Sequence, residues 1–213
     1  DLGALWTTGL SVANTGSAAA TVHLRFLGHD VDGREGLERS VPVDPGGTVA
    51  WDDLLGELFG LAQAWGGVQL RSASPSLAAT SLTTTPGGGG SFGQSVPLVA
   101  EAELIRSGSA RTILAVREDG SSRTNLVLAN ASEAPVDVDV ALVAKDGTPL
   151  GSRRVPLLPL ATTQLTRVVR ELGVTANVSG ARLVLSTPTP AGAFAAYASV
   201  IDAATNDPRT LLP

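Results

Sequence analysis

The side chains that most often carry enzyme chemistry are scarce in this sequence of 213 residues. There is no Cys and no Met, only one Lys, and the two histidines are His23 and His29. Without Cys, a thiol nucleophile, a disulfide framework and a thiolate-bound metal centre are excluded. Two histidines are also too few for a three-histidine metal site. Several classes of enzyme are therefore excluded before any motif is considered.

One stretch matches the Gly-x-Ser-x-Gly pattern that surrounds the nucleophile of α/β-hydrolases. Gly89, Ser91 and Gly93 supply the match. That pattern works where a sharp strand-to-helix turn exposes the serine, with the histidine later in the chain. Here no helical pattern follows Ser91, and both histidines precede it. The stretch is predicted to be a hairpin loop, and no catalytic residue is assigned.

Three carboxylates, Asp30, Asp32 and Glu35, lie close together around Gly33. Several carboxylates on one loop could bind Ca²⁺, which takes about six to eight oxygen ligands. Their spacing does not follow the EF-hand loop, and the matching turn in the second half of the chain has only Asp146. A solvated turn is the preferred interpretation. No other metal and no cofactor is predicted.

All three tryptophans lie in the first half of the chain, at Trp6, Trp51 and Trp65. Exposed aromatic rings can stack on sugars, so a carbohydrate site is conceivable. Trp51 takes the place of Leu165 in the internal repeat described below, which marks it as a core residue. Trp6 and Trp65 have no aromatic counterpart and are the candidates for ligand binding.

The charge and hydropathy pattern excludes two kinds of partner. The formal net charge is −5 and the isoelectric point is about 5.0. No cluster of Lys and Arg is visible, so nucleic-acid binding is not expected. No apolar run approaches the length of about 18 residues that a transmembrane helix needs. The first residue is Asp and no Met occurs, so we expect that the sequence begins after a processed or trimmed start and no longer includes any signal peptide.

An internal repeat organises the chain. Residues 8–14 (TGLSVAN) match residues 124–130 (TNLVLAN) at an offset of 116. Further blocks follow in the same order: 41–45 with 155–159, 53–58 with 167–172, 67–70 with 180–183, and 74–75 with 187–188. A series of matches in order indicates a tandem duplication. The predicted domains are residues 1–100 and 101–213.

Each copy is predicted to consist of short strands and one short helix. Apolar residues alternate at Val22, Leu24 and Phe26, and the second copy repeats the pattern from 136 to 142, which is typical of half-buried strands. Glycine-rich turns separate the runs, and the turn 145–147 predicts a hairpin. The helix is expected at 51–60, with Asp52 as N-cap and Gly60 just past its end. In the second copy Thr166 takes the cap position.

The two copies differ at their beginnings. Residues 109–117 form a convincing strand before the second copy, and nothing comparable precedes Trp6. One sheet of the first copy is therefore expected to lack a strand, unless the linker at 95–105 fills the place. An unpaired strand edge readily pairs with another chain.

The whole chain resembles tandem immunoglobulin-like β-sandwich repeats of secreted and surface proteins of bacteria. The resemblance rests on residues 123–130 (RTNLVLAN), a Val-Pro-x-x-Pro segment, the short helix and residues 196–202 (AYASVID). It implies an all-β fold of two immunoglobulin-like β-sandwich domains. Such repeats serve as noncatalytic spacers, adhesive modules or assembly units, so the resemblance transfers no catalytic residue. The first copy departs from the pattern at 6–9 and at 82–84.

Taken together, the sequence predicts a noncatalytic extracellular or cell-surface module that assembles with identical copies or with other surface proteins. Self-assembly into a filament or surface layer is the leading interpretation. An adhesive module that binds protein or carbohydrate is the alternative. An enzyme is not expected, because no constellation of residues supports one.

Overall fold

The computed structural model describes residues 5–87 and 89–213. Strands account for 56% of the chain and helices for 8%, which confirms the predicted all-β class. The chain divides into two compact units. The first unit comprises the described residues up to Gly28 together with Glu35–Leu98, and the second comprises His29–Arg34 and Val99–Pro213. The segment 29–34, which the sequence assigns to the first domain, thus packs with the second unit.

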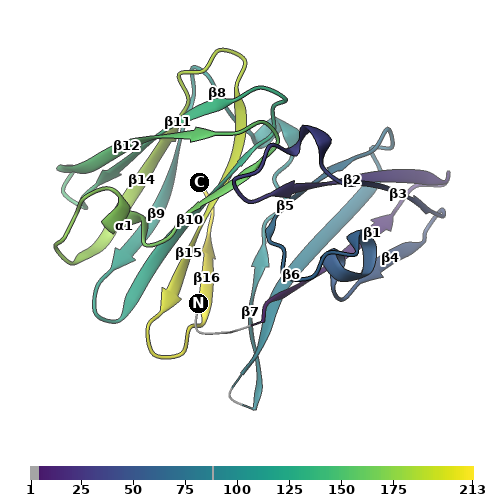
Figure 1. Cartoon of the computed structure of the whole chain (residues 1–213), viewed down its shortest axis with the longest axis horizontal. Coiled ribbons are helices and arrows are strands. Elements are labelled where there is room, and N and C mark those ends of the chain that lie inside the picture. Colours follow the sequence, from purple (N-terminus) through teal and green to yellow (C-terminus); the bar gives the residue numbers. More distant parts are fainter. Residues whose placement is uncertain (1–4, 88) are drawn as a thin grey trace. The chain divides into compact units, whose positions relative to one another are not determined.

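The first unit is built from two sheets (Figure 1). Its strands are β1 (Thr7–Asn14), β2 (Ala20–Gly28), β3 (Glu38–Val43), β4 (Thr48–Trp51), β5 (Gly66–Arg71), β6 (Leu77–Gly87) and β7 (Gly90–Val96). One sheet has the order β4-β1-β6-β7 and the other the order β3-β2-β5. A π-helical segment, Leu54–Leu58, follows β4, and a 3₁₀ turn, Gly33–Glu35, follows β2.

The second unit repeats this plan with additions. Its strands are β8 (Ile105–Arg106), β9 (Ala110–Glu118), β10 (Ser122–Asn130), β11 (Val136–Val143), β12 (Pro149–Leu157), β13 (Thr162–Leu165), β14 (Val178–Ser186), β15 (Ala193–Asp202) and β16 (Pro208–Leu211). One sheet has the order β13-β10-β15-β16, with β8 also paired to β15, and the other has the order β12-β11-β14-β9. The helix α1 (Val168–Glu171) follows β13, and a 3₁₀ turn, Glu101–Glu103, precedes β8.

Strand pairing repeats between the units almost residue for residue. Val22 of β2 pairs with Val41, and at an offset of 116 Val138 of β11 pairs with Val155. This agrees with the predicted repeat. One predicted match is wrong, however: Leu24 pairs with Leu70, whereas its counterpart pairs with Leu185. Residues 67–70 therefore correspond to 182–185 and not to 180–183, a slip of two residues that leaves the same side chains facing the core.

The first unit lacks the counterpart of β9. In the second unit β9 pairs with β14 and completes a four-stranded sheet. In the first unit β5 pairs with β2, and no strand of the described chain pairs with its other edge. The linker does not fill this place, because β7 pairs with β6 and β8 pairs with β15. The predicted inequality between the two copies is confirmed.

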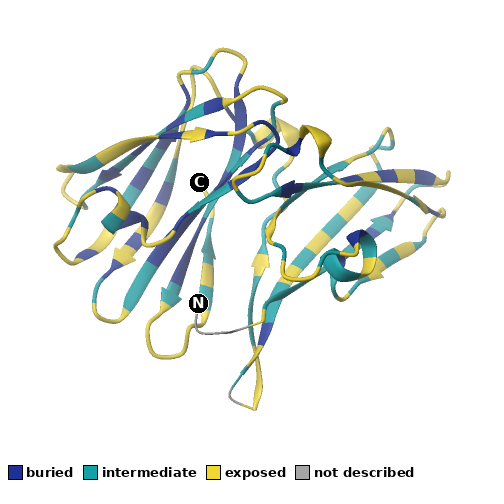
Figure 2. Ribbon diagram, viewed as in Figure 1, coloured by how far each residue is buried: buried dark blue, intermediate teal, exposed yellow. Residues whose placement is uncertain are grey.

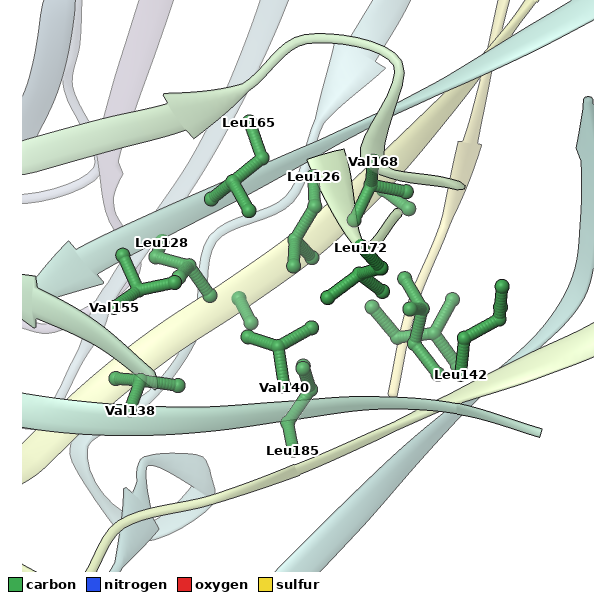
Figure 3. Close-up of a cluster of buried hydrophobic side chains, with 14 of the residues drawn as sticks. Leu126, Leu128, Val138, Val140, Leu142, Val155, Leu165, Val168, Leu172 and Leu185 are labelled. Carbon is green, nitrogen blue, oxygen red and sulfur yellow. The ribbon is translucent and has the colours of Figure 1, made fainter. Parts of the chain in front are cut away.

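The two cores differ accordingly. In the second unit, fully buried side chains from both sheets and from α1 form one cluster, in which Leu126 and Leu128 face Val138 and Val140 (Figure 3). In the first unit Leu10, Val12, Val22 and Leu24 are buried in the same way. Most of the apolar side chains that pack against them are only partly buried, namely Phe26, Val41, Val49, Trp51, Leu55, Leu58, Leu61, Val68, Leu70, Leu77 and Ala79. The core of the first unit is thus less completely covered (Figure 2).

The short helices occur where predicted, but their caps differ. Asp53, not Asp52, caps the segment of the first unit, because its Oδ1 accepts a hydrogen bond from the Gly56 amide at 3.1 Å. Gly60 adopts the expected left-handed conformation, with φ of 68°. In the second unit Arg167, not Thr166, is the N-cap of α1, and its φ is 58°. Arg167 has a left-handed backbone conformation and makes no capping hydrogen bond with its side chain. Because no residue type in the sequence marks such an N-cap, the prediction of Thr166 was wrong.

Both predicted hairpins form. The turn 145–147 joins β11 to β12, and Gly147 has a φ of 94°. The glycine-rich stretch also lies in a hairpin, between β6 and β7. The strands extend closer to its tip than expected, since Gly87 pairs with Gly90.

Candidate functional site

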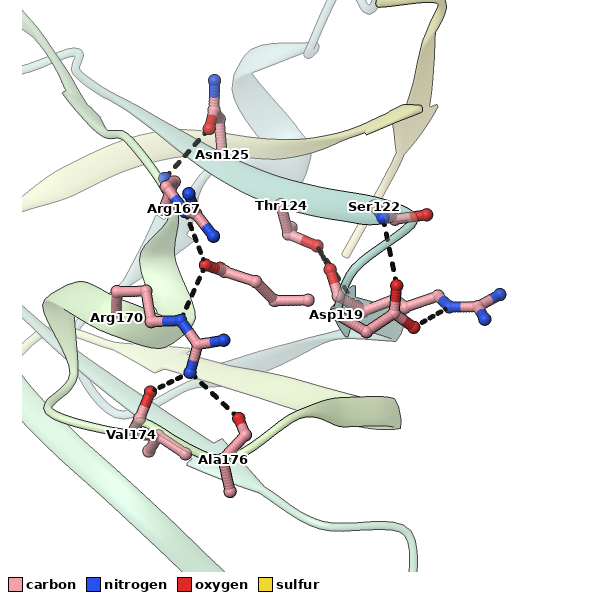
Figure 4. A network of polar contacts seen from close by, with 10 residues as sticks. Asp119, Ser122, Thr124, Asn125, Arg167, Arg170, Val174 and Ala176 are labelled. Carbon is pink, nitrogen blue, oxygen red and sulfur yellow. Dashed lines mark hydrogen bonds and ion pairs between the residues drawn. The ribbon is translucent and has the colours of Figure 1, made fainter. Parts of the chain in front are cut away.

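The most elaborate polar arrangement of the second unit surrounds Glu118, the last residue of β9. This side chain is fully buried. Its Oε1 accepts one hydrogen bond from Arg167 Nε, at a distance of 2.8 Å. The same oxygen forms an ion pair with Arg170, whose Nε is 3.2 Å away (Figure 4). Two guanidinium groups thus compensate one carboxylate that water does not reach, which is the condition under which a buried charge is tolerated.

Backbone contacts hold both arginines in place. The Arg167 amide donates to Asn125 Oδ1 of β10 at 3.0 Å. Arg170 also donates two hydrogen bonds to the chain that follows α1. Its Nη1 lies 2.7 Å from the Val174 carbonyl oxygen and 3.0 Å from the Ala176 carbonyl oxygen (Figure 4). The ion cluster therefore connects β9, β10, α1 and the loop that follows α1.

The turn between β9 and β10 is fixed by a second set of contacts. Thr124 Oγ1 donates to the Arg117 carbonyl at 2.5 Å. Asp119 accepts from Arg117 Nε at 2.6 Å and from the Ser122 amide at 3.1 Å (Figure 4). It also accepts from the Ser121 amide at 2.8 Å. The Arg117 guanidinium and the Ser121 donors hold the pKa of Asp119 well below its usual range. This carboxylate remains charged at any ordinary pH.

The chemistry that this arrangement supports is structural. Glu118 Oε1 is occupied by the two arginines, and Oε2 is buried without a hydrogen-bond partner in the described structure. A general base must come within hydrogen-bond reach of a substrate proton. A carboxylate enclosed by protein has no such access, so the cluster serves to anchor β9.

A second pair of residues has a structural role that the sequence analysis did not assign. Asn14 and Asn130, at the ends of the matching strands β1 and β10, are both fully buried. The side-chain amide of Asn14 donates to the carbonyls of Ala18 and Val43 at 2.8 and 3.1 Å. That of Asn130 donates to the carbonyls of Ala134 and Leu158 at 2.8 and 2.9 Å. The corresponding asparagine thus closes the corresponding loop in each unit with two side-chain hydrogen bonds.

The two tryptophans proposed as ligand contacts lie on different sheets. Trp6 directly precedes β1 and is partly buried. Trp65 directly precedes β5 and is 49% exposed. Trp51 packs against the core, as predicted. Trp65 is therefore the better placed of the two for contact with a partner, because it is the more exposed, and it directly precedes β5 in the chain.

Two of the three carboxylates proposed for calcium have separate partners, and the third is exposed. Asp32 forms an ion pair with Arg34 at 2.6 Å. Asp30 accepts a hydrogen bond from Thr163 Oγ1 at 2.6 Å, and Glu35 is exposed. Among the described residues, no three His, Asp or Glu side chains come together in a way that could hold a metal ion. The calcium hypothesis gains no support from this arrangement.

The other motif residues also fall in ordinary structural positions. Ser91 lies in β7, where it pairs with Pro86 across the hairpin. His23 Nδ1 lies 2.8 Å from Ser40 Oγ of the neighbouring strand. The serine and histidine of this exposed pair are within hydrogen-bond reach, but in the described part of the chain no carboxylate is hydrogen-bonded to His23, so the third group that would orient the base is missing.

No model of a known protein family matches the chain, and neither does any curated protein or solved structure. Fold and site together define an all-β protein with a repeated two-sheet unit. None of the helices in the described ranges is long and apolar enough to cross a membrane.

Proposed function

We propose that this chain is a noncatalytic structural module of an extracellular or cell-surface protein, and that it acts by assembling with further copies through exposed strand edges. The observation that carries the proposal is the unpaired edge of β5 in the first unit. Unpaired backbone N–H and C=O groups along such an edge are a template for another strand. The immunoglobulin-like pattern of the sequence supports the same role.

The edges of the two units are protected to different degrees. In the sheet of the second unit that corresponds to β3-β2-β5, both edge strands carry exposed arginines, Arg153 and Arg154 on β12 and Arg117 on β9. Charged side chains of this kind discourage edge-to-edge pairing. On β5 the one charged residue is Arg71 at the last position, and the five residues before it, Gly66–Leu70, carry no charge. Most of this edge therefore lacks the charged side chains that usually protect an edge against pairing.

The proposal predicts self-association that increases with protein concentration. Light scattering after gel filtration, across a wide concentration range, is expected to show masses above that of one chain. Gln69 alternates with the core-facing Val68 and Leu70 and is half-buried, with its Oε1 enclosed by protein. Gln69→Lys places a charge on this face of β5 and is expected to weaken the association, and circular dichroism checks that the variant folds. Ser152→Lys on β12, an edge that already carries arginines, is the matched control and is expected to change little. A strictly monomeric chain at every concentration contradicts self-assembly.

A further inference from the structure

We propose that β5 accepts an antiparallel strand from a separate polypeptide, in the place that β9 occupies in the second unit, and that this strand is apolar on one face and free of acidic residues at its end. The inference rests on the proposed assembly role and adds the chemistry of the partner strand. Three features of the first unit support it: the free edge, the uncovered core and the charge at the helix start.

The register of the second unit shows what the missing strand contributes. Ile113 of β9 lies opposite Leu183 of β14, and Val116 lies opposite Ala181. Ile113 and Val116 are both fully buried although they are three residues apart, because a bulge containing Ala115, with φ of 61°, shifts the register between them. The strand thus adds two apolar side chains to the core.

The same place in the first unit is uncovered. Leu70 corresponds to Leu185 and Val68 to Leu183, because each pair takes the same partners on β2 and β11. Leu183 and Leu185 are fully buried, whereas Val68 and Leu70 are only partly buried. The helix shows the same difference, since Leu58 is partly buried and its counterpart Leu172 is buried. Partial exposure along β5 and the helix is what a missing neighbouring strand leaves behind.

Charge at the helix start restricts which strand can fill the place. Arg167 and Arg170, which compensate Glu118 in the second unit, are replaced by Asp53 and Gly56 in the first. Asp53 caps the Gly56 amide, and Glu57 accepts a hydrogen bond from the Asp53 amide at 2.9 Å. A strand carrying a carboxylate in the position of Glu118 would therefore meet Asp53 where the second unit has Arg167, and Gly56 where it has Arg170. The partner strand is expected to carry a neutral or basic residue there.

Synthetic peptides test this inference directly. The probe is the peptide of residues 110–118 carrying Glu118→Arg, added to the whole chain. All three tryptophans lie in the first unit, so intrinsic tryptophan fluorescence reports binding there. We expect a saturable change, and binding about tenfold weaker for the peptide that keeps Glu118. A peptide with Ile113→Asp and Val116→Asp is the control and is expected not to bind.

Two results would overturn the inference: no fluorescence change with the Glu118→Arg peptide at millimolar concentration, or equal affinity for the peptides with and without Glu118. The Asp53→Arg variant of the protein gives a second measurement, because it is expected to reverse the preference between the two peptides. Circular dichroism checks that this variant folds. Self-association is measured separately by light scattering, so a chain that stays monomeric yet binds the peptide contradicts the assembly role and supports the strand-accepting edge.

Discussion

Replacing both Arg167 and Arg170 with Met is expected to lower the free energy of unfolding of the second unit by about 3–5 kcal/mol. Methionine keeps most of the apolar stem of each side chain and removes the charge. Glu118 would then be a fully buried carboxylate with no compensating partner, and such a group costs far more than the ion pair itself contributes. Urea unfolding followed by circular dichroism measures the loss.

A compensating substitution separates the ion cluster from general damage. Adding Glu118→Met to the double variant removes the uncompensated charge and is expected to restore most of the lost stability. Arg154→Met breaks an exposed ion pair with Asp139 and is the control, with an expected loss of about 0–1 kcal/mol. If the double variant is as stable as the unmodified chain, or if Glu118→Met gives no recovery, the assigned role of the cluster is wrong.

Leu70 and Leu185 occupy corresponding positions in the two units, and replacing each of them separately with Ala is expected to lower the free energy of unfolding by different amounts. Leu185→Ala removes a fully buried side chain from the second unit and is expected to cost about 2–5 kcal/mol. Leu70→Ala removes its counterpart, which is only partly buried, and is expected to cost less than half as much. The substitution is the same and the two leucines have matching register partners on β2 and β11, but β14 has β9 on its other side and β5 has no strand there, so the difference reports the cover that β9 provides.

Two signals allow the comparison within one chain. Tryptophan fluorescence follows the first unit, and Tyr197, the single tyrosine, lies in the second. Circular dichroism follows both units. Equal losses for Leu70→Ala and Leu185→Ala would show that the core of the first unit is as well covered as that of the second, and would contradict the missing strand.

Much of the fold could be predicted because its pattern is local. Alternation at Val22, Leu24 and Phe26 is enough to predict a strand with one buried face, and the structure pairs this strand as the repeat requires. The match between 67–70 and 180–183 failed for a physical reason. A strand has a period of two, so a slip of two residues keeps the same face inward and leaves the apolar pattern unchanged.

The ion cluster could not be predicted because its members are far apart in sequence. Glu118 ends an apolar strand and resembles an exposed charged residue at a turn, and Arg167 lies 49 residues away. Nothing in either local pattern indicates that the two meet in a buried place. What the sequence does show is the extra strand before the second copy, and that strand is the element that the cluster anchors.

Amide hydrogen exchange, measured residue by residue by NMR on the unmodified chain, distinguishes a strand with one neighbour from a strand with two. In the structure β5 has one partner strand, whereas β14 lies between β11 and β9. Amides all along β14 are expected to exchange slowly, while alternate amides of β5, those that point to its free edge, are expected to exchange at nearly the rate of an unfolded chain. Uniform protection along β5, equal to that of β14, would show that its second edge is already paired and would contradict this account.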